Sequence, residues 1–260
     1  MKTRIISGAV LVVVVASIIY AAMYLHIPFI LTAFLTFLTA VATFEMFGGT
    51  GIVKNKPLLI GAVIFSAAIQ ISFALLPQYV WYLAAAYGIF SAIICLGKKE
   101  SYKRTLFIVL MPVLLCVAFR SIGVLVDKGL INLLLILNFS SICDTGAYFV
   151  GVTMGKHKLC PKISPKKTIE GAVGGLIASI LVTILLTKLF AVPNMWLMVL
   201  LTPVFCIAGI IGDLSASVIK RRVGIKDYGK IIPGHGGIMD RFDSILLIAP
   251  IYVILYSFVG

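Results

Sequence analysis

Charge is scarce in this chain, and acidic charge most of all. Only 12% of the 260 residues are charged, with nine Asp and Glu against 22 Lys and Arg, whereas 61% are hydrophobic. A soluble domain cannot bury so much apolar surface, so the composition indicates an integral membrane protein. The net charge of +13 falls in short loops between apolar runs. That distribution favours membrane topology and phosphate-bearing ligands over nucleic acid as a partner.

Imidazole and thiol groups are equally sparse. The chain has three His and five Cys, and no CxxC pair. A zinc site of the Cys/His type is therefore not expected. Four of the cysteines lie in or beside apolar runs, which predicts small, buried apolar residues rather than metal ligands or disulfides.

Apolar runs long enough to cross a membrane follow one another along the whole chain. A spanning helix needs about 20 apolar residues. We therefore predict an all-α, polytopic membrane protein that forms one integral membrane domain over residues 1–260. The first run follows a basic start, as in a signal peptide, but its length favours an uncleaved helix. The predicted transmembrane helices, about nine, cover residues 5–24, 27–47, 57–76, 79–97, 105–126, 130–152, 170–191, 195–218 and 244–259.

The basic residues predict the orientation. If all nine runs cross the bilayer, 19 of the 22 Lys and Arg fall on one side, and the exceptions are Arg120, Lys128 and Lys188. Cytoplasmic loops carry the excess of Lys and Arg. The N-terminus is therefore predicted to be cytoplasmic and the C-terminus external, in a multi-pass protein of the inner (cytoplasmic) cell membrane. The two loops richest in charge, residues 153–169 and 219–243, then face the cytoplasm together.

Four charged residues fall inside predicted spans: Glu45, Arg120, Asp144 and Asp213. Each costs about 2.5–3.5 kcal/mol to insert, so each needs a physical reason. One reading, left open, is that Glu45 or Asp144 pairs with Arg120 and only holds helices together. For Asp144 and Asp213 a ligand site is favoured, because each precedes a basic loop and has small neighbours that leave room.

Polar residues continue along the helix that carries Asp213. Ser217, Lys220 and Arg221 follow it at i+4, i+7 and i+8, so all four lie on one face. A carboxylate, a hydroxyl and two cations in one stripe predict a site for a metal ion with its phosphate. A membrane-surface anchor would need the cations but not the carboxylate.

The loop that follows contains "PGHGGIMDRFDS". Its glycines permit positive φ, and consecutive backbone N–H groups in such a turn can bind an anion. Asp240 and Asp243 add hard oxygen atoms that suit Mg²⁺. A solvated basic loop would explain the Lys and Arg but neither the aspartates nor the glycines. In the other charged loop, "GKHKLCPKISPKKTIEG", prolines stiffen the chain that presents Lys166 and Lys167, and Thr168 is placed to cap the next helix.

Gly171 and Gly175 form a GxxxG step at the start of the seventh predicted span. Such a step predicts close helix packing or dimerisation rather than chemistry.

Together these segments resemble a known family. The run "SVIKRRVGIKDYGKIIPGHGGIMDRFD", residues 217–243, resembles the signature of the phosphatidate cytidylyltransferases, and "CDTGAYFVG", "SPKKTIEG" and "GDLSAS" resemble upstream segments of that family. One departure is Ala216, where members often carry Glu. The matched signature positions are Ser217, Lys220, Arg221, Lys226, Asp227, Gly229, Pro233, His235, Gly236, Gly237, Asp240, Arg241 and Asp243.

The resemblance implies transfer of the cytidylyl group of CTP to phosphatidate, giving CDP-diacylglycerol and pyrophosphate at the cytoplasmic face of the membrane. It also implies Mg²⁺, with the number of metal ions open, and a homodimer. The catalytic segment would be residues 140–244 or so. The roles expected for its residues are catalysis by Asp213, Asp240, Lys220, Arg221 and Arg241, metal binding by Asp213, Asp240, Asp144 and Asp243, and phosphate binding by Lys166, Lys167, Ser217, Lys226, His235, Gly236 and Gly237.

A transporter of an anionic solute is the alternative, with Arg120, Asp144 and Asp213 lining a path. It would be expected to show polar residues on both sides of the membrane and a repeat relating two halves. This sequence shows neither. Tyr148 and Tyr228 are candidates for stacking on cytosine.

Overall fold

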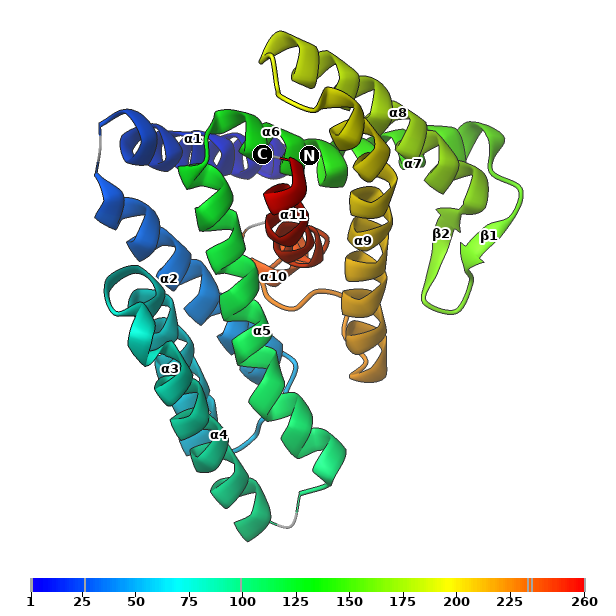
Figure 1. Cartoon of the computed structure of the whole chain (residues 1–260). Coiled ribbons are helices and arrows are strands. Elements are labelled where there is room, and N and C mark those ends of the chain that lie inside the picture. The colour runs from blue at the N-terminus through cyan, green and yellow to red at the C-terminus, as the bar shows by residue number, and fades with distance from the viewer. Residues whose placement is uncertain (1, 26, 99, 233, 235, 260) are drawn as a thin grey trace. The chain divides into compact units, whose positions relative to one another are not determined.

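A computed structural model describes residues 2–25, 27–98, 100–232, 234 and 236–259, and nearly all of them are helical (Figure 1). The helices and the two strands, in chain order, are α1 (Lys2–Tyr24), α2 (Pro28–Phe44), η1 (Glu45–Gly49), α3 (Lys56–Leu75), η2 (Pro77–Tyr79), α4 (Val80–Gly97), α5 (Tyr102–Asp127), α6 (Leu130–Leu137), η3 (Asn138–Ile142), α7 (Cys143–Met154), β1 (Lys158–Cys160), β2 (Ser164–Thr168), α8 (Ile169–Leu189), α9 (Met195–Arg222), α10 (Met239–Phe242) and α11 (Ile245–Val259).

The helices confirm an all-α, polytopic membrane protein. Among the described residues, seven helical stretches are long and apolar enough to cross a membrane. Two more apolar helices, Gly8–Tyr24 and Ile245–Tyr256, are shorter. Every one of the nine predicted runs is helical, but nine crossings and the sides of the two termini remain predictions. The four cysteines expected to be buried are buried free thiols. They are Cys95, Cys116, Cys143 and Cys206.

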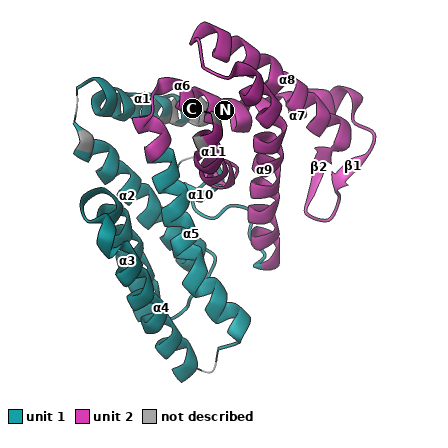
Figure 2. Ribbon diagram, viewed as in Figure 1, with its two compact units in different colours: residues 1–123, 223–241 teal, residues 124–222, 242–260 magenta. Residues whose placement is uncertain are grey.

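The chain divides into two compact units, coloured in Figure 2. Unit 1 comprises residues 1–123 and 223–241, and unit 2 comprises residues 124–222 and 242–260. Most of the charged loop predicted over residues 219–243, namely residues 223–241, therefore packs with the N-terminal helices. The prediction of a single domain is not tested by this division.

In unit 1, α3 and α4 pack against each other. A hydrogen bond links α4 to α5. The rings of Phe65 and Tyr87 stack with their centroids 4.0 Å apart. The Tyr87 hydroxyl, buried between helices, donates a hydrogen bond of 2.9 Å to the carbonyl oxygen of Ile108. Since a buried hydroxyl must be paired, this bond fixes α4 against α5.

In unit 2, α8 packs against α7 and α9 through a stripe of small residues. Its buried positions recur every four residues and grow in size along the helix: Gly171, Gly175, Ser179, Thr183 and Thr187. A β-carbon at Gly175 would collide with the carbonyl oxygen of Cys143 and lie 3.0 Å from Cβ of Ala147. The GxxxG step therefore serves helix packing within the chain.

The charged loop after α7 is not irregular. Residues Lys158–Cys160 and Ser164–Thr168 form an antiparallel hairpin, with Lys158 opposite Thr168 and Cys160 opposite Ser164. The prolines that predicted stiffness lie in its turn and its second strand. As expected, Thr168 caps α8, because its hydroxyl accepts the Gly171 N–H at 3.1 Å.

The close packing of α7 and α8 can be tested with Gly175→Ala. The added methyl group has no room, and overpacking typically costs about 1–3 kcal/mol. We expect a lower thermal unfolding midpoint of the purified protein in detergent. Gly97→Ala is the matched control, because a β-carbon at Gly97 would meet nothing within 4 Å. Equal midpoints for the two variants would contradict the packing described.

Candidate functional site

A pocket of about 550 Å³ lies in unit 2, within the range of about 300–1,000 Å³ usual for ligand sites. Helices α7, α8 and α9 and the β-hairpin all contribute to its wall. Cations and carboxylates line one part, and mainly apolar and aromatic residues line the rest. The lining residues are Asp144, Ala147, Tyr148, Gly151, Val152, Lys158, Leu159, Lys166, Lys167, Thr168, Ala172, Ile210 and Asp213.

An ion-pair cluster stands in this pocket. The Lys167 ammonium, carried by β2, forms an ion pair with Asp213 Oδ2 on α9 and lies 3.8 Å from Asp144 Oδ1 on α7. Burial lowers the pKa of Lys167, but the carboxylates of Asp213 and Asp144, with Asp243, outweigh it and hold the pKa above its usual value. The ammonium therefore stays charged between its carboxylates. The elements β2, α7 and α9 thus meet at one charge cluster, which brings Asp144 and Asp213 together.

Asp243, between α10 and α11, joins the same cluster. Gly212 makes this approach possible, since a β-carbon there would lie 2.6 Å from the carbonyl oxygen of Asp243. Burial, together with the Asp213 carboxylate, raises the pKa of the Asp243 carboxyl to about 7, against the opposing charge of Lys220. Lys220 is itself buried, and it lies on the same face of α9 as Asp213.

This raised pKa makes stability depend on pH in a defined direction. The ordinary pKa of 3.8 applies to the unfolded chain, so between about pH 4 and pH 7 the folded chain holds the Asp243 proton more tightly. The contribution of the Asp243 carboxyl to the free energy of unfolding is therefore most favourable below about pH 4. It falls as the pH rises to about 7 and is constant above that.

Asp243→Asn should remove this dependence. In EDTA, we expect the unfolding midpoint of the variant to fall less than that of the native protein between pH 5 and pH 8. Asp127→Asn, at the exposed end of α5, should follow the native profile. Parallel profiles for the native protein and Asp243→Asn would contradict the burial of an ionisable Asp243.

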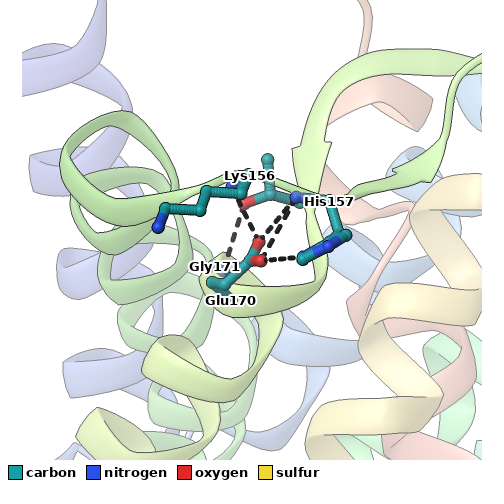
Figure 3. Close-up of polar contacts among 5 residues, drawn as sticks. Lys156, His157, Glu170 and Gly171 are labelled. Atoms are coloured by element: carbon teal, nitrogen blue, oxygen red, sulfur yellow. Dashed lines mark hydrogen bonds and ion pairs between the residues drawn. The ribbon is translucent and has the colours of Figure 1, made fainter.

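The carboxylate of Glu170 anchors the hairpin through the residues that precede it (Figure 3). Glu170, in the first turn of α8, accepts the backbone N–H groups of Lys156 and His157 at 3.1 Å each. Its Oε1 also lies 2.5 Å from Nδ1 of His157. The first residues of the hairpin are thereby tied to the helix that follows it, which limits where the hairpin lysines can point. The sequence did not predict this contact, although "TIEG" already showed a carboxylate one turn after the cap.

In unit 1, the glycine-rich loop is organised by two buried carboxylates. Glu45, at the start of η1, accepts the N–H groups of Ile238 at 3.1 Å and Met239 at 2.8 Å. Asp240 Oδ2 accepts the N–H groups of Tyr228 at 2.7 Å and Gly237 at 3.0 Å. These bonds compensate the carboxylates for lost hydration.

The glycines of this loop make room for the same carboxylates. A β-carbon at Gly229 or Gly237 would collide with the carboxylate of Glu45. Gly236 has a φ of +88°, a conformation that L side chains rarely adopt. We expected the N–H groups of this turn to face a phosphate. In the structure those of residues 237–239 are donated to Glu45 and Asp240 instead, because buried carboxylates need donors.

The two readings of the intramembrane charges can now be compared. Glu45 is bound by backbone N–H groups, not by Arg120, and the ion pairs found among the described residues do not include Arg120. Asp144 pairs with Lys167 rather than with Arg120. The pairing that was left open therefore does not occur. Glu45 is the residue that the sequence analysis undervalued, since it organises a loop about 190 residues away.

The predicted site residues divide between the two units. Unit 2 holds Asp144, Lys166, Lys167, Asp213, Ser217, Lys220, Arg221 and Asp243, and unit 1 holds Lys226, Gly236, Gly237, Asp240 and Arg241. His235 lies outside the described residues. The metal-binding role of Asp240 remains a prediction, while its visible contacts hold the loop together. Of the two stacking candidates, Tyr148 lines the pocket in unit 2 and the ring of Tyr228 is buried.

The donor atoms suit a hard divalent cation. No group of three or more His, Cys, Asp or Glu side chains that could hold a metal by itself occurs in the part of the chain that is described. Mg²⁺, however, commonly takes only one or two protein carboxylates, completing its shell with water and substrate phosphates. The carboxylates that converge on Lys167 meet that requirement.

Sequence comparison identifies the family of the chain. The profile of the cytidylyltransferase family matches residues 2–259. The chain belongs to the cytidylyltransferase family. Membership does not favour the transporter that the intramembrane charges had left open.

Curated relatives carry one name. The phosphatidate cytidylyltransferase of Staphylococcus haemolyticus is 44% identical over 117 residues, which are 44% of this chain and 44% of that protein. Those of Staphylococcus epidermidis and Staphylococcus aureus are 38% and 37% identical over 148 and 150 residues, 55% of this chain and 57% of each relative. The chain thus spans about half the length of the curated relatives it matches.

Proposed function

We propose that this membrane protein transfers the cytidylyl group of CTP to phosphatidate, giving CDP-diacylglycerol and pyrophosphate. The observation that carries the proposal is the convergence of Asp144, Lys167 and Asp213 in one pocket of unit 2. Family membership and the names of the staphylococcal relatives support it. The reaction would take place at the cytoplasmic face of the inner membrane, where the basic loops are expected.

The nucleophile is a phosphate oxygen of phosphatidate, which is ionised near neutral pH. It attacks the α-phosphorus of CTP, a new P–O bond forms, and the bond to the pyrophosphate leaving group breaks with its electron pair. No strong general base is required. The barrier comes from repulsion between two anions and from charge that develops on the leaving group, so positioned cations are the main requirement.

The residues of this chain meet that requirement from several sides. Lys166 and Lys167 present ammonium groups from the hairpin, and the pair with Asp213 holds the Lys167 ammonium in place. On α9, Lys220 and Arg221 would supply further cations for the phosphates, with Ser217 as a hydroxyl donor. The roles of Lys226 and Arg241, in unit 1, remain predictions from the sequence. Intramembrane placement of the acidic residues fits the substrate, because the phosphate of phosphatidate lies at headgroup depth.

Mg²⁺ is the cofactor of the proposal, and in unit 2 Asp144 and Asp213 would hold it with Asp243 nearby. A role of Asp240 as a metal ligand remains a prediction from the sequence. When bound, it would neutralise the phosphate oxygens and stabilise the charge of the leaving pyrophosphate. Whether a second ion takes part stays open. A homodimer is also part of the proposal, but it rests on the resemblance, since Gly171 and Gly175 are used inside the chain.

The direct test is incorporation of label from α-³²P-CTP into lipid by the purified protein with phosphatidate. We expect labelled CDP-diacylglycerol in the presence of Mg²⁺ and none in EDTA, with activity restored when excess Mg²⁺ is returned. No labelled lipid under any of these conditions would refute the proposed activity. Equal labelling with and without EDTA would remove the metal from it.

Asp213→Asn tests the cluster itself. Removing one charge from a preorganised electrostatic site typically costs about 100-fold or more in kcat, so we expect CDP-diacylglycerol formation to fall by about that factor. Asp127→Asn, the same chemical change on an exposed residue at the end of α5, should leave activity unchanged. Near-normal turnover by Asp213→Asn with an unaltered unfolding midpoint would remove Asp213 from the mechanism.

A further inference from the structure

A second pocket, of about 240 Å³, lies in unit 1. It is formed by the segment before α3, the end of α4 and the beginning of α5. Charged and amide side chains line one part, and apolar side chains line the other. The lining residues are Val53, Lys54, Asn55, Leu58, Ile94, Cys95, Lys98, Glu100, Arg104 and Ile108.

The pocket carries a net positive charge, with three cations against the single carboxylate of Glu100. Arg104 is held in place, because its guanidinium pairs with Glu100 at 2.8 Å and donates to the carbonyl oxygen of Ile52. The lysines are different. Lys54 and Lys98 are exposed, and the ion pairs found among the described residues include neither of them. Two cations are thus presented beside a fixed Arg–Glu pair.

The position of the pocket along its helices matters as much as its charge. Helix α3 begins at Lys56, α4 ends at Gly97 and α5 begins at Tyr102, so three membrane-spanning stretches have their ends at this pocket. Its apolar lining includes Leu58, Cys95 and Ile108, all of them buried. Cations at the ends of spans, above an apolar lining, match the change from headgroup to hydrocarbon in a lipid leaflet.

The size limits the ligand. At about 240 Å³ the pocket falls below the range of about 300–1,000 Å³ typical of sites for drug-sized molecules. It suits a phosphate group with a small alcohol better than a nucleoside triphosphate. Basic pockets between the ends of transmembrane helices commonly bind the headgroups of anionic lipids.

We propose that this pocket binds the phosphate of an anionic phospholipid, with Lys54 and Lys98 on the phosphate oxygens and Arg104 completing the cationic wall. The shared chemistry is a phosphate ester, and the lipid is the occupant to which the apolar lining points. This site does not depend on the proposed cytidylyl transfer, because its residues differ from those around Lys167.

The test uses the full-length protein in a neutral detergent and a phosphatidylglycerol that carries a photoreactive group on its headgroup. After irradiation, the labelled peptides are mapped, and the labelling of residues 50–60 and 94–108 is followed as the probe is titrated. We expect labelling there, displaced by unlabelled phosphatidylglycerol but not by phosphatidylcholine. Mapping separates this site from any binding in unit 2.

The variants isolate the two lysines. Each basic residue near an anionic headgroup is worth a factor of about five in affinity. Lys54→Gln combined with Lys98→Gln should therefore raise the probe concentration needed for half-maximal labelling about 30-fold. Lys54→Arg with Lys98→Arg should retain binding. The matched control is Lys56→Gln with Lys103→Gln, which removes the same charge from nearby positions outside the pocket lining and should leave half-saturation unchanged. Unfolding midpoints of all variants verify folding.

Several outcomes would overturn the proposal. Unchanged labelling in the double Gln variant, an equal loss in the control, or equal displacement by phosphatidylcholine would each contradict a specific headgroup site. Displacement by inorganic phosphate as effective as that by phosphatidylglycerol would assign the pocket to free phosphate and contradict the lipid as its occupant.

Discussion

A cation between carboxylates is the interaction on which the pocket of unit 2 depends. An isolated charge in an apolar environment is costly, and the cost falls when opposite charges meet. Lys167 meets Asp213 and Asp144, so β2, α9 and α7 are drawn to one point. Close helix packing makes this meeting possible. The glycines of α8 allow α7 to approach, and Gly212 lets the segment at Asp243 approach α9.

The same constraint acts in unit 1 with different partners. Glu45 and Asp240 are satisfied by backbone N–H groups rather than by cations. One kind of side chain therefore serves two purposes. Where carboxylates meet an ammonium group, they hold a charge in a pocket. Where they meet the main chain, they give a glycine-rich loop a fixed shape.

Much of this was predictable from the sequence. Hydropathy located every long apolar helix, and the cost of intramembrane charge singled out Asp144 and Asp213 before any geometry was known. Other features were not predictable. The partner of Glu45 lies nearly 200 residues away, and no local pattern specifies such a contact. The hairpin at 158–168 was hidden because its prolines and lysines have low strand propensity, and its ladder is short. The division into two units followed from the return of residues 223–241 to the N-terminal helices.

That return has a consequence for biogenesis. Glu45 enters the membrane with the second helix, yet the N–H groups that bind it belong to residues 238 and 239. During synthesis the carboxylate must pass through the insertion of the helices between residues 45 and 238 without its eventual donors. Contacts of such long sequence separation form late. The shape of the glycine-rich loop is thus among the last features to be completed, and a truncated polypeptide cannot acquire it.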